Sequence, residues 1–389
     1  MKMNLGLIIS DNSNCTFKSK TPKESHSVFG KSIGQWSAAA LNDITENIQT
    51  ISYQDLDKCK ELVSQSEQVL VNWADQPLIL CDTFKQLLKI HTEGQHATAI
   101  FGGTGEAVIY AFNSSILLQK LGELNVLNLS RDILRQIFKS IKNTNKIVYE
   151  DKNQFLVLND RIALSMVTSE IKSRIIKDIM LSGVTIIDPN STYIDADVKI
   201  GLDTIILPNT IIEGHTSIGE DSIIGPNSRM TNCKIGNNVE FANSVAIDSS
   251  VGDETHVGPF AYLRPGSAVG SKVKIGDFVE IKKSIIGDRT KISHLTYVGD
   301  AEIGKNVNIG CGVVVVNYDG KHKNKTVVED NSFIGCNTNL VSPVVVHNDA
   351  YIAAGSTITD DVPEDSLAIA RERQVIKTGW VSKKGLKRE

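Results

Sequence analysis

The chain has 389 residues, of which 41% are hydrophobic and 22% are charged, values that are ordinary for a globular protein of two domains. A net charge of −4 gives no electrostatic reason to expect a nucleic acid or an acidic membrane as partner, and no apolar run approaches the roughly 20 residues that cross a bilayer. The six cysteines form no Cys-x-x-Cys pair, so we expect reduced thiols in a cytoplasmic protein, not zinc ligands or a disulfide framework.

The N-terminal half carries weak but readable signals. Its first apolar run, near residues 5–9, is too short for the core of a signal peptide and predicts a buried strand. A segment rich in Ile and Lys from about Thr168 to Ser182 predicts a helix that links this half to the next. We expect the domain boundaries 1–167, 168–185 for the linker helix, 186–362, and 363–389 for a C-terminal tail.

An aliphatic residue recurs every six positions through most of the C-terminal half, often followed by Gly. This period fits neither an α-helix nor a simple hairpin sheet, and it indicates a parallel β-helix with three short sides per coil of about 18 residues. The sequence therefore predicts roughly eight to ten coils around an aliphatic core. The repeating residues are Ile194, Ile200, Ile206, Ile212, Ile218, Ile224, Val251, Val257, Leu263, Val269, Ile275, Ile281, Ile286, Ile292, Val298, Ile303, Ile309, Val315, Val328, Ile334, Leu340, Val346, Ile352 and Ile358.

One segment, Asn317–Thr326, interrupts the period. It carries Asp-Gly and three lysines between two inward valines. An insertion of this kind is expected to leave the coil as a loop, and such loops often lie on the binding face of a solenoid. On its own, the segment fits a binding loop and a solvated turn equally well.

Several polar residues in the repeats are not needed for core packing, and here a family resemblance becomes specific. The strings VGPFAYLRPG, GDFVEIKK, HLTYVGDAEIGKNVNIG, NYDGKHKNKT and IAAGSTIT follow in order, with a closing ARERQ and GW. From Val257 to Trp380 the chain resembles the acetyltransferase domain of the bacterial bifunctional N-acetylglucosamine-1-phosphate uridyltransferase/glucosamine-1-phosphate acetyltransferase (GlmU) family. The resemblance implies a left-handed parallel β-helix, acetyl-CoA as co-substrate, a sugar phosphate as acceptor, and a homotrimer.

The resemblance also implies a role for each matching position. His294 would be the general base and Glu280 would orient it. The sugar phosphate would be held by Arg264, Lys282, Tyr297, Asn308 and Lys323. The acetyl-CoA site would be lined by Cys311, Asn317, Tyr318, Cys336, Ala354 and Arg371. Family members commonly have Ala and Ser where this chain has Cys311 and Cys336. The backbone of Cys311 would contact the thioester, so we expect its thiol to be tolerated, and the weaker thiol donor of Cys336 to modestly weaken CoA binding.

The N-terminal half resembles the family's Rossmann-like uridyltransferase only in traces. The stretch Ile9–Phe17 contains neither the glycine nor the arginine of the family's nucleotide loop, and it adds an acid. Asp75 and Asn159 match vestiges of the Mg²⁺ site, so Mg²⁺ is expected only if that site is still active. Residues 102–105 (Gly-Gly-Thr-Gly) are more consistent with a sugar-contacting remnant or a turn than with a phosphate loop. We therefore predict a shortened, degenerate α/β domain without useful uridyltransferase activity.

Three alternatives to a monofunctional glucosamine-1-phosphate N-acetyltransferase remain open at this point. The chain fits an acyltransferase for another amino sugar or nucleotide sugar, because a degraded partner domain is typical of redeployed duplicates. It also fits a non-catalytic trimeric scaffold. A still bifunctional enzyme requires that the N-terminal site has survived its losses.

Overall fold

The computed structural model describes residues 4–11, 16–91, 94–102, 107–149 and 153–386, which form two compact units. The N-terminal unit runs from Met1 to Lys177 and the C-terminal unit from Asp178 to Glu389, so the division falls within one long helix. No helix in the described part of the chain is long and apolar enough to cross a membrane.

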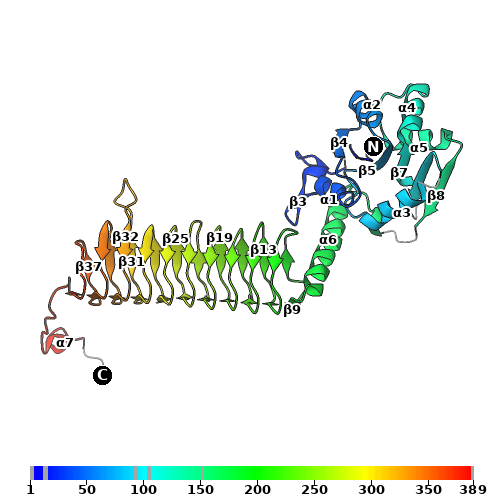
Figure 1. Ribbon diagram of the computed structural model, residues 1–389. Helices are drawn as coiled ribbons and strands as arrows, with labels where there is room; N and C mark the ends of the chain where they lie inside the picture. Colours follow the sequence, from blue (N-terminus) through cyan, green and yellow to red (C-terminus); the bar gives the residue numbers. More distant parts are fainter. Residues whose placement is uncertain (1–3, 12–15, 92–93, 103–106, 150–152, 387–389) are drawn as a thin grey trace. The chain divides into compact units, whose positions relative to one another are not determined.

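The N-terminal unit is built on a mixed six-stranded sheet in the order β4-β1-β5-β7-β6-β8 (Figure 1). Strand β1 is parallel to both of its neighbours, and β7 is antiparallel to β5 and β6. All six residues of β1 are buried, which confirms the predicted N-terminal strand. The strands are β1 (Leu5–Ser10), β4 (Ile48–Ser52), β5 (Gln68–Trp73), β6 (Ala97–Phe101), β7 (Ala107–Asn113) and β8 (Thr144–Val148).

Helices cover both faces of this sheet, giving the three layers of an α/β fold. Helices α2, α4 and α5 bury Val63, Leu117 and Ile137 in one core, and α3 buries Phe84 and Leu87 in the other. Strands β2 (Ser27–Val28) and β3 (Lys31–Ser32) form a small separate hairpin. The helices are α1 (Ile33–Ala39), α2 (Leu56–Ser64), α3 (Cys81–His91), α4 (Ser114–Glu123) and α5 (Arg131–Ser140), and short 3-10 turns span Lys23–Ser25 and Asn153–Phe155.

The predicted linker helix is α6 (Arg161–Leu181), which begins earlier than the expected Thr168. The reason is Asp160, whose Oδ1 accepts a hydrogen bond from the backbone N–H of Ala163 at 2.8 Å and so satisfies one of the free amides of the first turn. The helix ends before Gly183, whose φ of 100° suits glycine better than any other residue.

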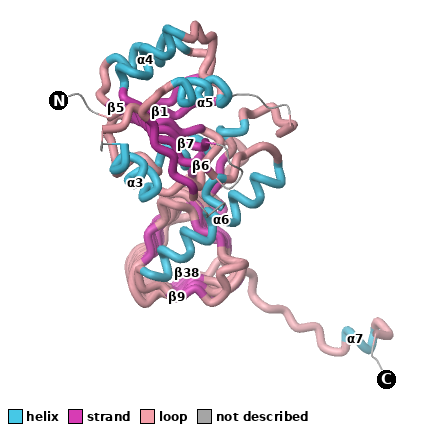
Figure 2. The backbone as a smooth tube through the Cα atoms, turned by 90° about the vertical axis from the view of Figure 1, so that its right-hand side faces the viewer, coloured by secondary structure: helices cyan, strands magenta, loops and turns pink. Residues whose placement is uncertain are grey.

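The C-terminal unit is a left-handed parallel β-helix with three faces, here named A, B and C in the order in which each coil visits them (Figure 1). Viewed end-on, successive coils superimpose (Figure 2). Face B has ten strands, which confirms the expected number of coils. Face A contains β9 (Thr185–Ile186), β12 (Ile205–Ile206), β15 (Ile223–Ile224), β18 (Glu240–Phe241), β21 (His256–Val257), β24 (Lys274–Asp277), β27 (Lys291–His294), β30 (Asn308–Ile309), β33 (Phe333–Ile334), β36 (Tyr351–Ile352) and β38 (Leu367–Ala368). Face B contains β10 (Tyr193–Ile194), β13 (Ile211–Glu213), β16 (Arg229–Thr231), β19 (Val245–Ile247), β22 (Tyr262–Leu263), β25 (Glu280–Lys282), β28 (Tyr297–Gly299), β31 (Val314–Val316), β34 (Asn339–Val341) and β37 (Thr357–Ile358). Face C contains β11 (Lys199–Ile200), β14 (Ser217–Ile218), β17 (Lys234–Ile235), β20 (Ser250–Val251), β23 (Ala268–Val269), β26 (Ile285–Ile286), β29 (Ala301–Ile303), β32 (Thr326–Val328) and β35 (Val344–Val346).

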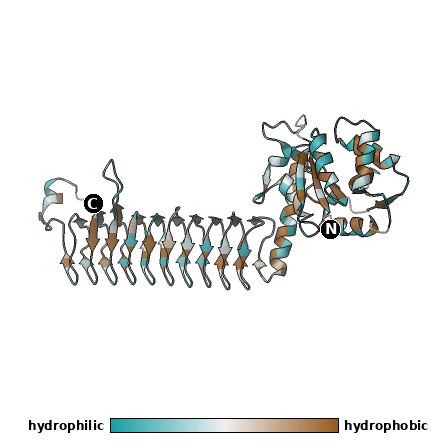
Figure 3. Ribbon diagram, turned by 45° about the horizontal axis from the view of Figure 1, so that its top comes forward, coloured by the Kyte–Doolittle hydropathy of each residue, from teal (hydrophilic) through white to brown (hydrophobic). Residues whose placement is uncertain are grey.

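The six-residue period fills the core of the solenoid as predicted. Every repeating aliphatic residue is buried except Ile200, which is half-buried, and hydrophobic strands recur along the whole solenoid (Figure 3). From β12 to β36, each coil turns from face A to face B through a residue with positive φ. In the first three of these coils this residue is Asn, and Asn227 both accepts from Asn209 at 3.1 Å and donates to Asn243 at 3.0 Å. Asparagine tolerates this conformation better than most residues.

The interruption at Asn317–Thr326 leaves the coil as a loop beside β31 and β32, which confirms that expectation (Figure 1). The loop is held by its own polar contacts. The carboxylate of Asp319 accepts from the backbone N–H groups of Lys321 at 2.8 Å and His322 at 2.6 Å. These hydrogen bonds lower the pKa of Asp319 below its ordinary value, so the loop keeps this charge at neutral pH. A short antiparallel bridge between Tyr318 and Lys323 closes its base.

Candidate active site along one corner of the solenoid

Five residues follow one another along the corner between faces A and B, one in each of five consecutive coils: Asp277, His294, Cys311, Cys336 and Ala354. Asp277 and His294 are paired by strand register. The registers of β27 with β30, β30 with β33, and β33 with β36 continue the series to the other three. Each of the five directly precedes the turning residue of its coil. We name this set the corner column. Four of its members were expected at the site from the sequence, and Asp277 was not.

His294 is oriented by Asp277, because the carboxylate Oδ1 of Asp277 contacts the imidazole Nδ1. This hydrogen bond lowers the pKa of Asp277, so the carboxylate stays charged at neutral pH. The expected contact between Glu280 and His294 is not among the contacts of the described residues. Glu280 lies beyond the turn, on face B, where its Oε1 accepts from Nη1 of Arg264 at 2.8 Å. The orienting carboxylate within the chain is therefore Asp277, and Glu280 holds Arg264 in place.

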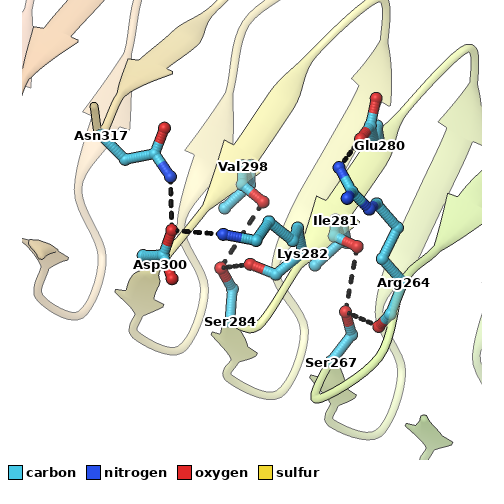
Figure 4. Close-up of polar contacts among 9 residues, drawn as sticks. All are labelled: Arg264, Ser267, Glu280, Ile281, Lys282, Ser284, Val298, Asp300 and Asn317. Atoms are coloured by element: carbon cyan, nitrogen blue, oxygen red, sulfur yellow. Dashed lines mark hydrogen bonds and ion pairs between the residues drawn. The ribbon is translucent and has the colours of Figure 1, made fainter. Parts of the chain in front are cut away.

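A second group of polar side chains lies at the other edge of face B, where Lys282, Asp300 and Asn317 stand at the ends of β25, β28 and β31 (Figure 4). Asp300 is its centre, because one oxygen of its carboxylate accepts from Nζ of Lys282 at 2.7 Å and from Nδ2 of Asn317. The side chains of Lys282 and Asp300 are only 15% and 14% exposed. Burial acts to raise the pKa of Asp300, but the hydrogen bonds from Lys282 and Asn317 outweigh it and the pKa lies below its ordinary value. Asp300 thus joins a predicted sugar-phosphate residue to a predicted CoA residue.

Lys323, in the Asn317–Thr326 loop, interacts with the polar group around Asp300. Its hydrogen-bonding contact with Lys282, together with the repulsion between the two charges, lowers the pKa of Lys323. The hydrogen bond with Asp300 raises the pKa of Lys282 instead. Two lysine side chains beside one carboxylate carry an excess positive charge, which is the electrostatic setting that a phosphate group requires.

The position of Tyr297 depends on a glycine. A Cβ built on Gly299 would lie 2.3 Å from the Tyr297 hydroxyl and 2.9 Å from Nδ2 of Asn317, so no side chain fits there. The tyrosine hydroxyl and the asparagine amide therefore converge over the bare backbone of Gly299. Tyr297 thereby lies with the group around Asp300.

The remaining predicted residues are placed less uniformly. Asn308 lies on face A, in register with Lys291, whereas Lys282 and Tyr297 lie on face B. Tyr318 is exposed in the loop, and its hydroxyl donates to the carbonyl of Gly320 at 2.7 Å. The side chain of Arg371 passes next to Gly355, which follows Ala354, so it reaches the end of the corner column.

The vestigial metal residues of the N-terminal unit do not fit a divalent cation. Asp75 follows β5, and its carboxylate receives Nζ of Lys23 at 2.7 Å on one oxygen and the guanidinium of Arg131 on the other. The Asp75 and Lys23 side chains are 6% and 7% exposed, and Arg131 stacks over Trp73 at 4.4 Å. Asn159 lies close by, because Leu158, the residue before it, donates its backbone N–H to the carbonyl of Asp75. Two internal cations thus hold the oxygens that Mg²⁺ would need.

No group of three or more His, Cys, Asp or Glu residues suited to a metal occurs in the described ranges. Of the sequence features singled out in this unit, residues 12–15 of the stretch Ile9–Phe17 and residues 103–105 of the Gly-Gly-Thr-Gly segment lie outside the described residues. The structure therefore describes the surroundings of Asp75, the expected metal ligand, but not residues 12–15 or 103–105.

The solenoid and its corner site define a transferase of the hexapeptide-repeat class. Residues 197–232 and 325–360 match the family described as "Bacterial transferase hexapeptide (six repeats)". The chain is 59% identical over 286 residues to the bifunctional protein GlmU of Acetivibrio thermocellus, a match that covers 72% of this chain and 62%, just under two thirds, of the relative. It is 38% identical over 462 residues to GlmU of Clostridium botulinum strain 657, covering 98% of this chain and 99% of the relative. The chain belongs to the GlmU family.

Two further facts come from the same comparisons. The alignment with the C. botulinum relative runs over 462 positions, and this chain has 389 residues, so that relative carries segments that are missing here. Among solved structures, the UDP-N-acetylglucosamine acyltransferase of Arabidopsis is 16% identical, with a TM-score of 0.33 over 51% of this chain and 77% of the other.

Proposed function

We propose that the solenoid transfers the acetyl group of acetyl-CoA to the amine of glucosamine 1-phosphate, a step toward UDP-N-acetylglucosamine. The observation that carries this proposal is the corner column. It sets a histidine that a carboxylate orients in line with Cys311, Cys336 and Ala354, the positions that family resemblance gives to acetyl-CoA. At the opposite edge of face B, the cationic group around Asp300 is suited to a phosphate.

In this proposal His294 is the general base. Its Nδ1 is engaged by Asp277, so the Nε2 atom is available to accept a proton from the substrate. A sugar amine with a pKa similar to that of an α-amino group, about 7.7–8.0, keeps a minor neutral fraction at neutral pH, and this form is the nucleophile. Proton removal by His294 as the nitrogen attacks the thioester carbon keeps the forming amide neutral. No covalent intermediate with the protein is needed.

The negative charge that develops on the thioester oxygen needs a donor, and the backbone N–H of Cys311 is suited to this role. Among the described residues, no carbonyl or side chain accepts a hydrogen bond from that N–H. It lies one coil from His294 in the corner column. A free amide close to the base stabilises the oxyanion as it forms.

We further propose that the active form is a homotrimer, as the resemblance to the family implies. Support comes from Phe260 and Phe278, the positive-φ residues at which two successive coils turn from face A to face B. Phe278 belongs to the coil of Asp277, and Phe260 belongs to the coil before it. Their rings stack with centroids 5.3 Å apart, yet they are 57% and 56% exposed. Leu295 continues this apolar strip beside His294 and is also exposed. An exposed apolar strip next to the site is typical of a surface that another subunit covers.

The loss of uridyltransferase activity is likewise our proposal. The stretch Ile9–Phe17 has no glycine to let backbone amides approach a triphosphate, and the carboxylate of Asp75 is held by Lys23 and Arg131. The test is incubation with UTP, Mg²⁺ and N-acetylglucosamine 1-phosphate. We expect no pyrophosphate release above background, and robust release would contradict the proposal.

The acetyltransferase proposal is tested by following CoA thiol release from acetyl-CoA with a panel of amino-sugar phosphates. We expect release with glucosamine 1-phosphate that depends on His294. Release only with another amino sugar would redirect the proposal to that acceptor. Release with none of them would favour a non-catalytic scaffold.

A further inference from the structure

Two cysteines, Cys311 and Cys336, occupy the corner column in adjacent coils. The register of β30 with β33 aligns Ile309 with Ile334, and the cysteines follow two residues later in both coils. A hydrogen bond of 2.8 Å from the N–H of Asn337 to the carbonyl of Cys311 holds the two corners together. Although 25 positions separate them in the sequence, the two thiols are therefore neighbours in the fold.

The spacing of the coils suits a disulfide. Hydrogen-bonded strands lie about 4.7–4.9 Å apart, and the Cα atoms of a disulfide lie about 4.4–6.8 Å apart. Side chains of this column do reach one another, because Asp277 and His294 are in contact at the same position of two neighbouring coils. Gly312, with a φ of 74°, follows Cys311 directly, and this glycine lets the corner adapt to the Cβ separation of about 3.5–4.5 Å that a disulfide takes.

Both thiols are accessible to an oxidant. Cys336 is exposed and Cys311 is partly exposed. Cys59 and Cys233, in contrast, are buried, and burial raises the pKa of the Cys59 thiol to about 12, which suppresses its thiolate. Cys81 is partly exposed but lies in the N-terminal unit. Among the described cysteines, only Cys311 and Cys336 are aligned by the register of neighbouring strands.

We propose that Cys311 and Cys336 form a reversible disulfide that closes the acetyl-CoA site. The oxidant is a low-molecular-weight disulfide. The thiolate of the more exposed Cys336 attacks one sulfur of that disulfide and releases the first thiol. The thiolate of Cys311 then attacks the Cys336 sulfur and releases the second. The two protein thiols are oxidised by two electrons, the small disulfide is reduced to two thiols, and the two protons go to those thiols.

The consequence for activity rests on the proposed function. The bridge would replace two independent side chains in the lining of the acetyl-CoA site and fix Cys311, whose N–H is the proposed oxyanion donor. It would also tie the coil that carries the Asn317–Thr326 loop to the coil that follows it. Disulfides of cytosolic proteins are usually transient and redox-sensing. The pair would therefore lower acetyl transfer under oxidising conditions and restore it on reduction.

The test uses the full chain and oxidised glutathione. After incubation, free thiols are alkylated and the peptides are analysed by mass spectrometry, while acetyl-CoA affinity is measured by calorimetry before oxidation, after oxidation, and after dithiothreitol. We expect a peptide crosslink between Cys311 and Cys336, an affinity loss of about tenfold or more, and recovery on reduction. Cys336→Ser and Cys311→Ala should each keep their own affinity for acetyl-CoA through oxidation, whereas Cys81→Ser should respond like the parent.

Three outcomes would overturn the proposal: both thiols still alkylated, only mixed disulfides with glutathione, or a crosslink that leaves acetyl-CoA affinity unchanged. Mass spectrometry decides the crosslink independently of catalysis. A reduced protein that binds acetyl-CoA but transfers no acetyl group would contradict the proposed function and leave the switch on acetyl-CoA binding intact. A reduced protein that binds no acetyl-CoA would contradict both.

Discussion

Asp277 and His294 hold the same position in two successive coils, and the carboxylate of the first contacts Nδ1 of the second. The stacking of coils thus places the carboxylate of Asp277 against Nδ1 of His294 and leaves Nε2, the other ring nitrogen, on the side away from this contact. A general base needs this kind of fixed orientation, because its free nitrogen must point at the proton that it removes.

Replacing Asp277 by Asn should lower kcat by about tenfold or more, with little effect on the KM for either substrate. His294→Ala should cost more, about 10²–10⁴-fold, because it removes the base itself. The double variant should be no slower than His294→Ala alone, because the two residues act as a unit. Steady-state kinetics of the three variants provides the check. Additive losses in the double variant would show that Asp277 acts on something other than His294.

Replacing Asp300 by Ala should weaken both substrates at once. The change leaves Nζ of Lys282 and the amide of Asn317 without their shared acceptor, and we expect a loss of about 1–3 kcal/mol in stability. The KM for the sugar phosphate and the KM for acetyl-CoA should both rise. The measurements are thermal unfolding and the two KM values. The matched control is Asp248→Ala, because it removes a carboxylate that accepts a hydrogen bond from Asn232 elsewhere in the solenoid.

The charges around Asp300 predict a pH dependence. The pKa of Asp300 is lowered, so its ionised form adds stability above about pH 4, the ordinary range of an Asp, and this is lost only as the pH falls through the lowered value. The pKa of Lys282 is raised, so its contribution is complete below the ordinary lysine range and is lost as the pH rises through the raised value. The ion pair should therefore persist across the neutral range. The free energy of unfolding, measured at several pH values between these limits, should show no pH-dependent change that Asp300→Ala removes.

Lys323 behaves in the opposite sense, because its contact with Lys282 lowers its pKa. Binding of the sugar phosphate should weaken as the pH rises, at a lower pH than for an ordinary lysine. Lys323→Arg keeps the charge at all accessible pH values and should move this alkaline limb upward. The measurement is the KM for the sugar phosphate against pH. An identical limb in both proteins would show that another group titrates.

The apolar strip predicts the effect of surface changes on assembly. Phe260→Ser and Phe278→Ser together should convert the proposed trimer to smaller species, because they remove exposed area and no core contact. Leu127→Ser is the matched control, since Leu127 is an exposed apolar residue of the N-terminal unit. Sedimentation velocity reads the outcome, and a double variant that sediments like the parent would place the interface elsewhere.

The sequence predicted the solenoid well because one rule, an inward aliphatic residue at each sixth position, is local and repeats along the chain. It assigned His294 and the CoA residues by resemblance, and the corner column brings four of them together. It missed Asp277, because the register that pairs it with His294 is 17 residues and no six-residue count reaches it. Aligning Ile275 with Ile292 and reading two residues further would have found it.

Other misses have the same physical origin, namely contacts between residues far apart in sequence. Glu280 lies only three residues from Asp277, but the corner between them turns it onto face B and to Arg264. The two cations that contact Asp75, Lys23 and Arg131, lie 52 and 56 residues away in the sequence, and no local pattern marks either of them as a partner of this carboxylate. Helix α6 begins at Arg161, before the expected Thr168, because Asp160, the residue after the expected metal ligand Asn159, caps the helix.

The central claim is acetyl transfer to a hexosamine 1-phosphate with His294 as base. The most direct measurement is the release of CoA thiol from acetyl-CoA, with and without glucosamine 1-phosphate, by the parent protein and by His294→Ala. We predict acceptor-dependent release by the parent and a loss of about 10²–10⁴-fold in the variant, with acetyl-CoA binding retained. Equal release by both proteins, or no acceptor-dependent release by the parent, would contradict the assignment.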